Sequence, residues 1–219
     1  MMQVPQRSRG HNGVGARTFM AGAIMLSSRP LWPSQMFIVP HDLHPPTWRQ
    51  GAPDTDPATR EWLLDTGSLT RRLTALAAGR FSVQPLHEGW QTLRDDECAA
   101  LQLPLASTGW VREVYLLGAD TPWVFARSVA GRSALAAHGL NLDTLGSRSL
   151  GELLFSDPAF TRQPLQTCRY PGSWLPAAHN RDSLWARRSR FDRQGLGVLV
   201  AEVFLPALWH TALPLQETR

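Results

Sequence analysis

The sequence predicts an α+β fold in which an antiparallel sheet of about six strands carries short helices on one side. Several runs alternate apolar and polar residues with period two, as half-buried strands do. The clearest two, residues 110–118 and 123–129, are joined by the turn-forming run Ala-Asp-Thr-Pro and predict a hairpin. Between the strand-like runs lie short segments with helical spacing, several of which follow a residue that can cap a helix.

The length and the hydrophobic content, 219 residues and 43%, suit a single ordinary core. We expect a flexible basic extension over residues 1–50, one domain over 51–210 and a short tail over 211–219. No apolar run approaches the roughly 20 residues of a membrane-spanning helix, which predicts no stable membrane insertion. Cys98 and Cys168 match no metal-ligand spacing, so free thiols in a reducing cytoplasm are expected.

The basic character of the chain is a weak argument for a nucleic-acid partner. The formal net charge is +4, and all 22 basic residues are arginine. These arginines are spread along the chain without a basic run or a recognisable reader motif. We therefore expect no nucleic-acid partner, and an RNA-binding protein is left as an alternative that only the charge supports.

Two short helices open the domain. Asp56 and Pro57 fit an N-cap followed by the first helical residue, and Ser68 fits the cap of a second helix. In that second helix Leu69 and Leu73 share one face, and Gly79 ends it.

The later elements follow from the same signals. Pro85 places the first strand at a sheet edge, because proline cannot donate to a ladder. The expected strands are 81–90, 110–118, 123–129, 160–170, 184–191 and 195–206. The expected helices are 94–102, 131–138 and 149–155, and residues 171–182 are expected to form a surface insertion.

Two charged residues stand out because each lies on an apolar strand face. Counting in twos, Glu202 shares a face with Val198 and Val200, and Arg112 shares a face with Val114. An unpaired buried charge costs several kcal/mol or more. Each residue therefore needs a partner or a functional task.

Common catalytic signatures are absent from the sequence. It contains no phosphate-binding glycine loop, no His-Glu-x-x-His, no Cys-x-x-Cys and no Gly-x-Ser-x-Gly. His87 and His138 lack partners at useful spacing, which favours structural roles. No metal and no cofactor are expected, and the remaining arginine and carboxylate suit a small aromatic or cyclic carboxylate held between apolar walls.

Six segments in order resemble the chorismate pyruvate-lyase (chorismate lyase) family. The likeness runs from about residue 57 to residue 206, and its spacing makes it more specific than any single motif. The segments are Trp-Leu-Leu-Asp-x-Gly-Ser-Leu-Thr-Arg-Arg-Leu at 62–73, Trp-Val-Arg-Glu-Val at 110–114, Pro-Trp with Ala-Arg at 122–127, Leu-Gly-Glu-Leu-Leu-Phe at 150–155, Leu-Trp-Ala-Arg-Arg-Ser-Arg at 184–190 and Glu-Val-Phe-Leu-Pro at 202–206.

The resemblance implies a chorismate lyase-like fold and a carbon–oxygen lyase. Such an enzyme converts chorismate to 4-hydroxybenzoate and pyruvate without metal or cofactor, the first committed step of bacterial ubiquinone biosynthesis. By similarity, Arg112 holds the ring carboxylate, Glu202 meets the 4-hydroxyl, and Leu69 and Leu150 contribute to the pocket. The chemistry needs positioning and electrostatics rather than a nucleophile.

The facing directions leave Arg127 and Arg187 as alternatives for the second carboxylate of chorismate. A different class of function is a small-ligand-binding, effector-sensing domain of the same fold, which catalyses nothing. Such domains usually follow a winged helix-turn-helix, and no segment before Asp56 has the length or periodicity of one. We expect the protein to act as a monomer.

Overall fold

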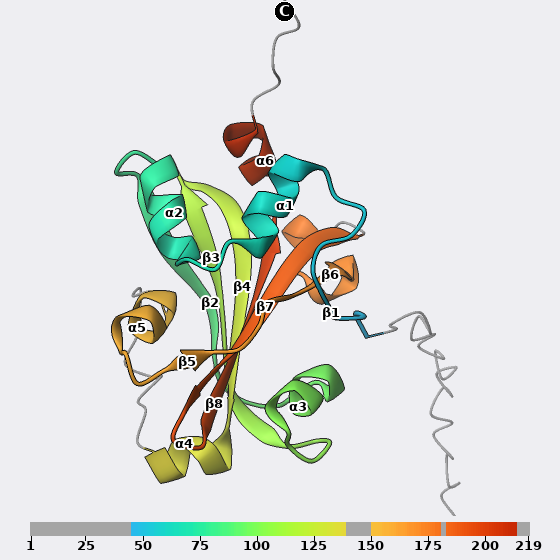
Figure 1. The fold of residues 1–219 in the computed structure, drawn as a ribbon, viewed down its shortest axis with the longest axis vertical. Coiled ribbons are helices and arrows are strands. Elements are labelled where there is room, and N and C mark those ends of the chain that lie inside the picture. The colour runs from blue at the N-terminus through green and yellow to red at the C-terminus, as the bar shows by residue number, and fades with distance from the viewer. Residues whose placement is uncertain (1–44, 139–149, 181–182, 214–219) are drawn as a thin grey trace, which may run out of the picture. The chain divides into compact units, whose positions relative to one another are not determined.

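The computed structural model describes residues 45–138, 150–180 and 183–213. They form an eight-stranded sheet in which every pairing is antiparallel (Figure 1). Seven strands follow the order β1-β6-β7-β8-β4-β3-β2, and β5 pairs with β7 beside this path. The strands are β1 (Arg49–Gln50), β2 (Phe81–Thr92), β3 (Thr108–Gly118), β4 (Thr121–Gly131), β5 (Thr161–Arg162), β6 (Gln166–Tyr170), β7 (Leu184–Arg193) and β8 (Leu196–Phe204).

The described helices are short. They are α1 (Pro57–Leu64), α2 (Leu69–Leu76), α3 (Asp95–Leu101), α4 (Arg132–His138), α5 (Leu150–Ser156) and α6 (Pro206–Ala212), with 3-10 turns η1 (Gly172–Trp174) and η2 (Ala177–His179). None of the helices in the described part of the chain has the length and apolarity needed to cross a membrane.

The two predicted caps at the start of the domain are confirmed. The Asp56 carboxylate accepts the backbone N–H of Thr59 at 2.9 Å, and the Ser68 hydroxyl accepts that of Arg71 at 3.3 Å. Each contact satisfies one of the N–H groups that a helix start leaves unpaired. The predicted cap at Ser149 and most of the predicted N-terminal extension lie outside the described residues.

Side-chain alternation gives the sheet two faces. The site face is defined by Val114, Ala126 and Val200, and α1, α2, α4, α5 and α6 pack on it. The α3 face is defined by Val111, Val129 and Leu199, which pack with α3. A further cluster of apolar side chains on the α3 face includes Leu175 from the turn between η1 and η2.

The α+β class and the antiparallel sheet are confirmed, and the structure corrects three details. Helix α3 covers the opposite face from the other helices, so the helices do not lie on one side only. The segment predicted as one strand, 160–170, divides into β5 and β6 around Pro164. Strand β1 lies at the end of the segment expected to be a flexible extension, residues 1–50, and raises the strand count to eight. Segment 171–182 was predicted to lie on the surface, yet its Leu175 is buried.

The edge position predicted from Pro85 is also confirmed. Strand β2 ends the sheet beside β3, and the register shifts between Pro85 and His87. This shift accommodates a residue that has no N–H to donate.

Candidate active site

Arg112 and Glu202 point to the same face of the sheet, the site face. Arg112 on β3 lies opposite Ser128 on β4, which lies opposite Val200 on β8, two residues before Glu202. The Cα atoms of Arg112 and Glu202 are two strand spacings apart across the sheet and two residues apart along the strand. Together these displacements give a distance of about 12 Å. Two long, oppositely charged side chains at this spacing can contact the two ends of one small ring-shaped ligand.

Arg112 is buried, and a residue of the edge strand β2 holds its side chain in place. Its side chain is 3% exposed, and its Nε donates to Oε1 of Glu88 on β2 at 2.5 Å. Glu88 lies directly opposite Arg112 in the β2–β3 ladder. A neighbouring carboxylate of this kind compensates the charge of the buried guanidinium and orients its plane.

Glu202, whose side chain is only partly exposed, has the cationic partner that a carboxylate on an apolar strand face requires. Arg187 on β7 lies opposite Glu202 and donates from Nε to Glu202 Oε2 at 2.7 Å. Nη1 of Arg187 also donates to the backbone carbonyls of Trp62 at 3.0 Å and Asp65 at 2.7 Å, at the end of α1. A cation is favoured there, because the carbonyls of the last helical turn are partly unpaired.

A second arginine holds the connection between α1 and α2. Arg162 on β5 donates from Nε to the hydroxyl of Ser189 at 2.8 Å and from Nη1 to the carbonyl of Thr66 at 2.7 Å. Burial and the nearby cation of Arg187 lower the pKa of Arg162. Arg162 and Arg187 together tie this connection to the sheet just before Leu69.

Leu69 and Leu150 are the first residues of α2 and α5, two helices in contact with each other. Their exposed fractions are 2% and 4%. Leu69 packs in the cluster that contains Ala126, and Leu150 packs in the cluster that contains Val200. The structure therefore brings all four residues singled out from the sequence to one face of the sheet.

The alternative assigned to Arg127 does not fit this arrangement. Arg127 points to the α3 face, where it donates to both carboxylate oxygens of Glu97, at 2.6 and 3.0 Å, and to Glu113 at 2.8 Å. Burial alone would lower the pKa of Arg127, but these two carboxylates outweigh it and raise that pKa. On an antiparallel strand Arg127 and its neighbour Ala126 face opposite ways, so Arg127 anchors α3 instead.

Three residues of this arrangement were missed by the sequence reasoning: Glu88, Arg162 and Ser189. Glu88 lies in the expected edge strand 81–90 and Arg162 in the expected strand 160–170, and no local pattern distinguishes either residue. Their roles depend on which strands pair and in which register, a relationship that a single sequence does not encode locally.

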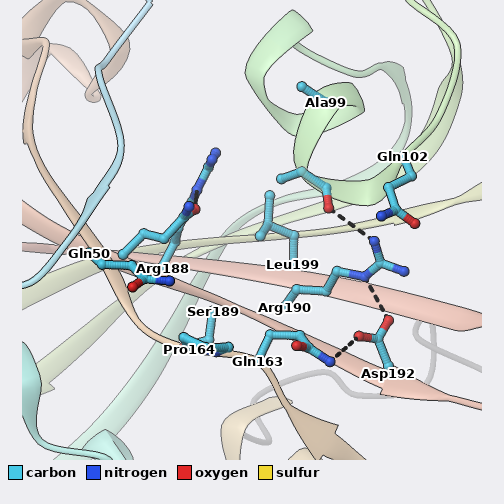
Figure 2. Close-up of a pocket in the computed structure, with 12 residues that line it drawn as sticks. Gln50, Ala99, Gln102, Gln163, Pro164, Arg188, Ser189, Arg190, Asp192 and Leu199 are labelled. Carbon is cyan, nitrogen blue, oxygen red and sulfur yellow. Dashed lines mark hydrogen bonds and ion pairs between the residues drawn. The ribbon is translucent and has the colours of Figure 1, made fainter.

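The α3 face carries a separate cavity of about 580 Å³. Figure 2 shows the guanidinium of Arg190 beside the carboxylate of Asp192, which also accepts from Gln163. The same guanidinium donates to the carbonyl of Ala100 at 3.1 Å. These polar groups already bond to one another, and most of the lining comes from α3 and the α3 face of the sheet. The cavity is therefore distinct from the candidate active site, although Ser189 borders both.

Within the described ranges no group of three or more His, Cys, Asp or Glu side chains is placed to hold a metal ion.

Comparison with known proteins then decides the family. The profile described as "Chorismate lyase" matches residues 43–213. The chain belongs to the chorismate lyase family.

Close relatives of this chorismate lyase family member come from pseudomonads. It is 64% identical over 172 residues to "Probable chorismate pyruvate-lyase 2" of Pseudomonas entomophila, which covers 78% of this chain and 92% of the relative. It is 67% identical over 156 residues to "Probable chorismate pyruvate-lyase" of Pseudomonas aeruginosa PAO1, with 71% and 88% covered.

Among solved structures, the effector domain of PhnF from Mycobacterium smegmatis aligns with a TM-score of 0.45 at 12% identity, over 66% of this chain and 91% of that one. A TM-score of this size supports no functional comparison.

Proposed function

We propose that this protein, a carbon–oxygen lyase of the chorismate lyase family, converts chorismate to 4-hydroxybenzoate and pyruvate. The observation that carries the proposal is the placement of Arg112 and Glu202 on one sheet face, about 12 Å apart between Cα atoms. The relatives named "Probable chorismate pyruvate-lyase" support it, since they match most of the chain at more than 60% identity.

In this proposal Arg112 binds the ring carboxylate and Glu202 binds the 4-hydroxyl. Arginine offers a fork of donors that suits a carboxylate, and Glu88 already orients that fork through Nε. Glu202 offers an acceptor to a hydroxyl while Arg187 occupies its Oε2. Leu69 and Leu150 close the pocket from the starts of α2 and α5.

The reaction is an elimination that needs no external reagent. The electrons of one ring C–H bond form the new ring double bond, and the bond from the adjacent carbon to the ether oxygen breaks. The enolpyruvate that leaves takes up a proton on its methylene carbon and becomes pyruvate, while the ring becomes aromatic. Arg112 and Glu202 contribute by fixing the ring and stabilising charge, which can lower a barrier by several kcal/mol.

We further propose that the reaction is the first committed step of ubiquinone biosynthesis, carried out in the cytoplasm by a monomer. The state of the cysteines supports a reducing compartment, because Cys98 and Cys168 are buried free thiols. Cell fractionation and light scattering on the purified protein test the location and the monomeric state.

The net charge of +4 does not require a nucleic-acid partner. Seven arginines already pair with carboxylates of the described chain: Arg72, Arg112, Arg127, Arg187, Arg188, Arg190 and Arg193. Salt-dependent binding to RNA would contradict this reading.

The direct experiment is incubation of the purified protein with chorismate while the ultraviolet absorbance of 4-hydroxybenzoate is followed. We expect turnover by the wild type and none by Arg112→Ala. Arg190→Gln, on the α3 face of β7, serves as the control and should keep near-normal turnover. Binding of chorismate without product formation would favour the effector-sensing alternative.

A further inference from the structure

Arg162 is a cation whose hydrogen-bond partners in the described structure are all neutral. It donates to the Ser189 hydroxyl at 2.8 Å, to the Thr66 carbonyl at 2.7 Å and to the Gly67 carbonyl at 3.4 Å. The other two arginines that hold the site, Arg112 and Arg187, each pair with a carboxylate at 2.7 Å or less. Within the described residues, Arg162 therefore brings to this face of the sheet a positive charge that has no carboxylate among its hydrogen-bond partners.

The surroundings of Arg162 make that charge costly. Its guanidinium carbon lies 5.3 Å from the ring centre of Phe155 and 5.4 Å from that of Phe191. Burial, followed by the neighbouring cation Arg187, lowers its pKa. The carboxylates of Glu202 and Asp65 offset this only in part, because the pKa of Arg162 stays below its ordinary value, so an anion bound at the guanidinium would stabilise it further.

The sheet register places Arg162 on the far side of the site from Arg112. Ser189, which Arg162 contacts, lies opposite Val200, and Val200 lies in the same cross-strand row as Arg112. Three strand spacings put the Cα atoms of Arg112 and Ser189 about 14 Å apart. Glu202 lies in the adjacent row, and its charge acts on Arg162.

Chorismate carries a second anionic group, the enolpyruvyl carboxylate, that suits this position. Its enolpyruvyl ether sits on the ring carbon next to the one that bears the hydroxyl. If Arg112 takes the ring carboxylate and Glu202 the hydroxyl, the enolpyruvyl carboxylate comes close to Glu202, and two like charges need a cation between them. Arg187 already donates to Glu202 and to two backbone carbonyls, whereas Arg162 donates only to neutral groups in the described chain, which favours Arg162.

We propose that Arg162 binds the enolpyruvyl carboxylate of chorismate and so makes the site selective for a dianion. The inference rests on the proposed function and extends it to a further substrate-binding residue. It also couples the substrate to the α1–α2 connection, because the same guanidinium holds the Thr66 carbonyl three residues before Leu69.

A pair of ligands that the enzyme cannot turn over tests the inference. The first is 3-carboxymethoxy-4-hydroxybenzoate, which carries the second carboxylate, and the second is its isosteric amide, 3-carbamoylmethoxy-4-hydroxybenzoate. Calorimetric titration of each gives a ratio of dissociation constants, amide over acid. A charge-assisted contact predicts a ratio of roughly tenfold or more for the wild type.

The variants separate binding from a purely structural role. Arg162→Gln should reduce the ratio to about one, while Arg162→Lys, which keeps a cation, should retain most of it. A loosened α1–α2 connection would weaken both ligands alike and leave the ratio unchanged. Arg190→Gln, the same substitution on the α3 face of β7, should behave as the wild type does.

Two results would overturn the inference: a wild-type ratio near one, or an Arg162→Gln ratio equal to that of the wild type. Neither depends on turnover. Absence of 4-hydroxybenzoate formation from chorismate by the wild type would instead count against the proposed function.

Discussion

Glu202 and Arg187 lie directly opposite one another on β8 and β7, joined by a 2.7 Å bond from Arg187 Nε to Glu202 Oε2. The same guanidinium reaches the carbonyls of Trp62 and Asp65 at the end of α1. One ion pair thus connects the proposed hydroxyl-binding carboxylate to the helix connection above it.

Breaking this pair should destabilise the fold. Arg187→Met leaves the Glu202 carboxylate, which is 16% exposed, without its cation, and we expect a loss of roughly 3 kcal/mol in the free energy of unfolding. Urea denaturation measures it. Arg193→Met, on the same strand but in a more exposed pair with Asp157, is the matched control and should cost much less. Equal losses for the two variants would contradict the assigned importance of the buried pair.

Glu88 should act on ligand binding through Arg112. Glu88→Ala removes the acceptor for Arg112 Nε and should weaken 4-hydroxybenzoate binding about tenfold, whereas Glu88→Gln keeps an acceptor and should stay close to the wild type. Titration calorimetry of both variants is the measurement. In an Arg112→Gln background, Glu88→Ala should have no further effect on affinity, and an additive loss there would show that Glu88 acts by another route.

The acid stability of the protein should depend in part on Asp65. Burial alone would raise the pKa of Asp65, but the Gly67 N–H and Arg72 outweigh it, so the pKa lies below its ordinary value of 3.8. The unfolded state then binds the proton more readily, and the stabilisation is present above about pH 3.8 and lost as the pH falls through the folded-state pKa.

The substitution Asp65→Asn removes the titrating carboxyl group and therefore this dependence of stability on pH. We expect the stability difference between wild type and Asp65→Asn, measured by urea unfolding, to be larger at about pH 6 than at about pH 2.5. High salt should shrink the difference at the higher pH, because it screens the contribution of Arg72. A difference that stays constant across this pH range would rule out the lowered pKa as its source.

Much of the fold was predictable because its signals are local. Caps at Asp56 and Ser68 depend on neighbouring residues, and the hairpin of β3 and β4 depends on alternation and one turn. The position of α3 on the opposite face was not predictable. Its anchoring depends on the pairing of Glu97 with Arg127, contributed by a strand 30 residues away.

The same distinction between local signals and long-range pairing explains which features of the candidate site could be predicted from the sequence. Alternation placed Arg112 and Glu202 each on an apolar strand face, since the period of two is local. That they share one face depends on the order β3-β4-β8, which joins strands far apart in the chain. Arg162 was passed over for this reason, because its relation to Ser189 arises only when β5 pairs with β7.

The central claim is that Arg112 and Glu202 bind opposite ends of one ring. Its most direct test compares the affinities of 4-hydroxybenzoate, benzoate and 4-hydroxybenzyl alcohol for the wild type, Arg112→Gln and Glu202→Gln. We predict that Arg112→Gln abolishes the advantage of 4-hydroxybenzoate over the alcohol, which lacks the carboxylate, but keeps its advantage over benzoate, which lacks the hydroxyl. Glu202→Gln should do the reverse. The account would be contradicted if one variant lost both the preference over the alcohol and the preference over benzoate. It would also be contradicted if both variants kept both preferences.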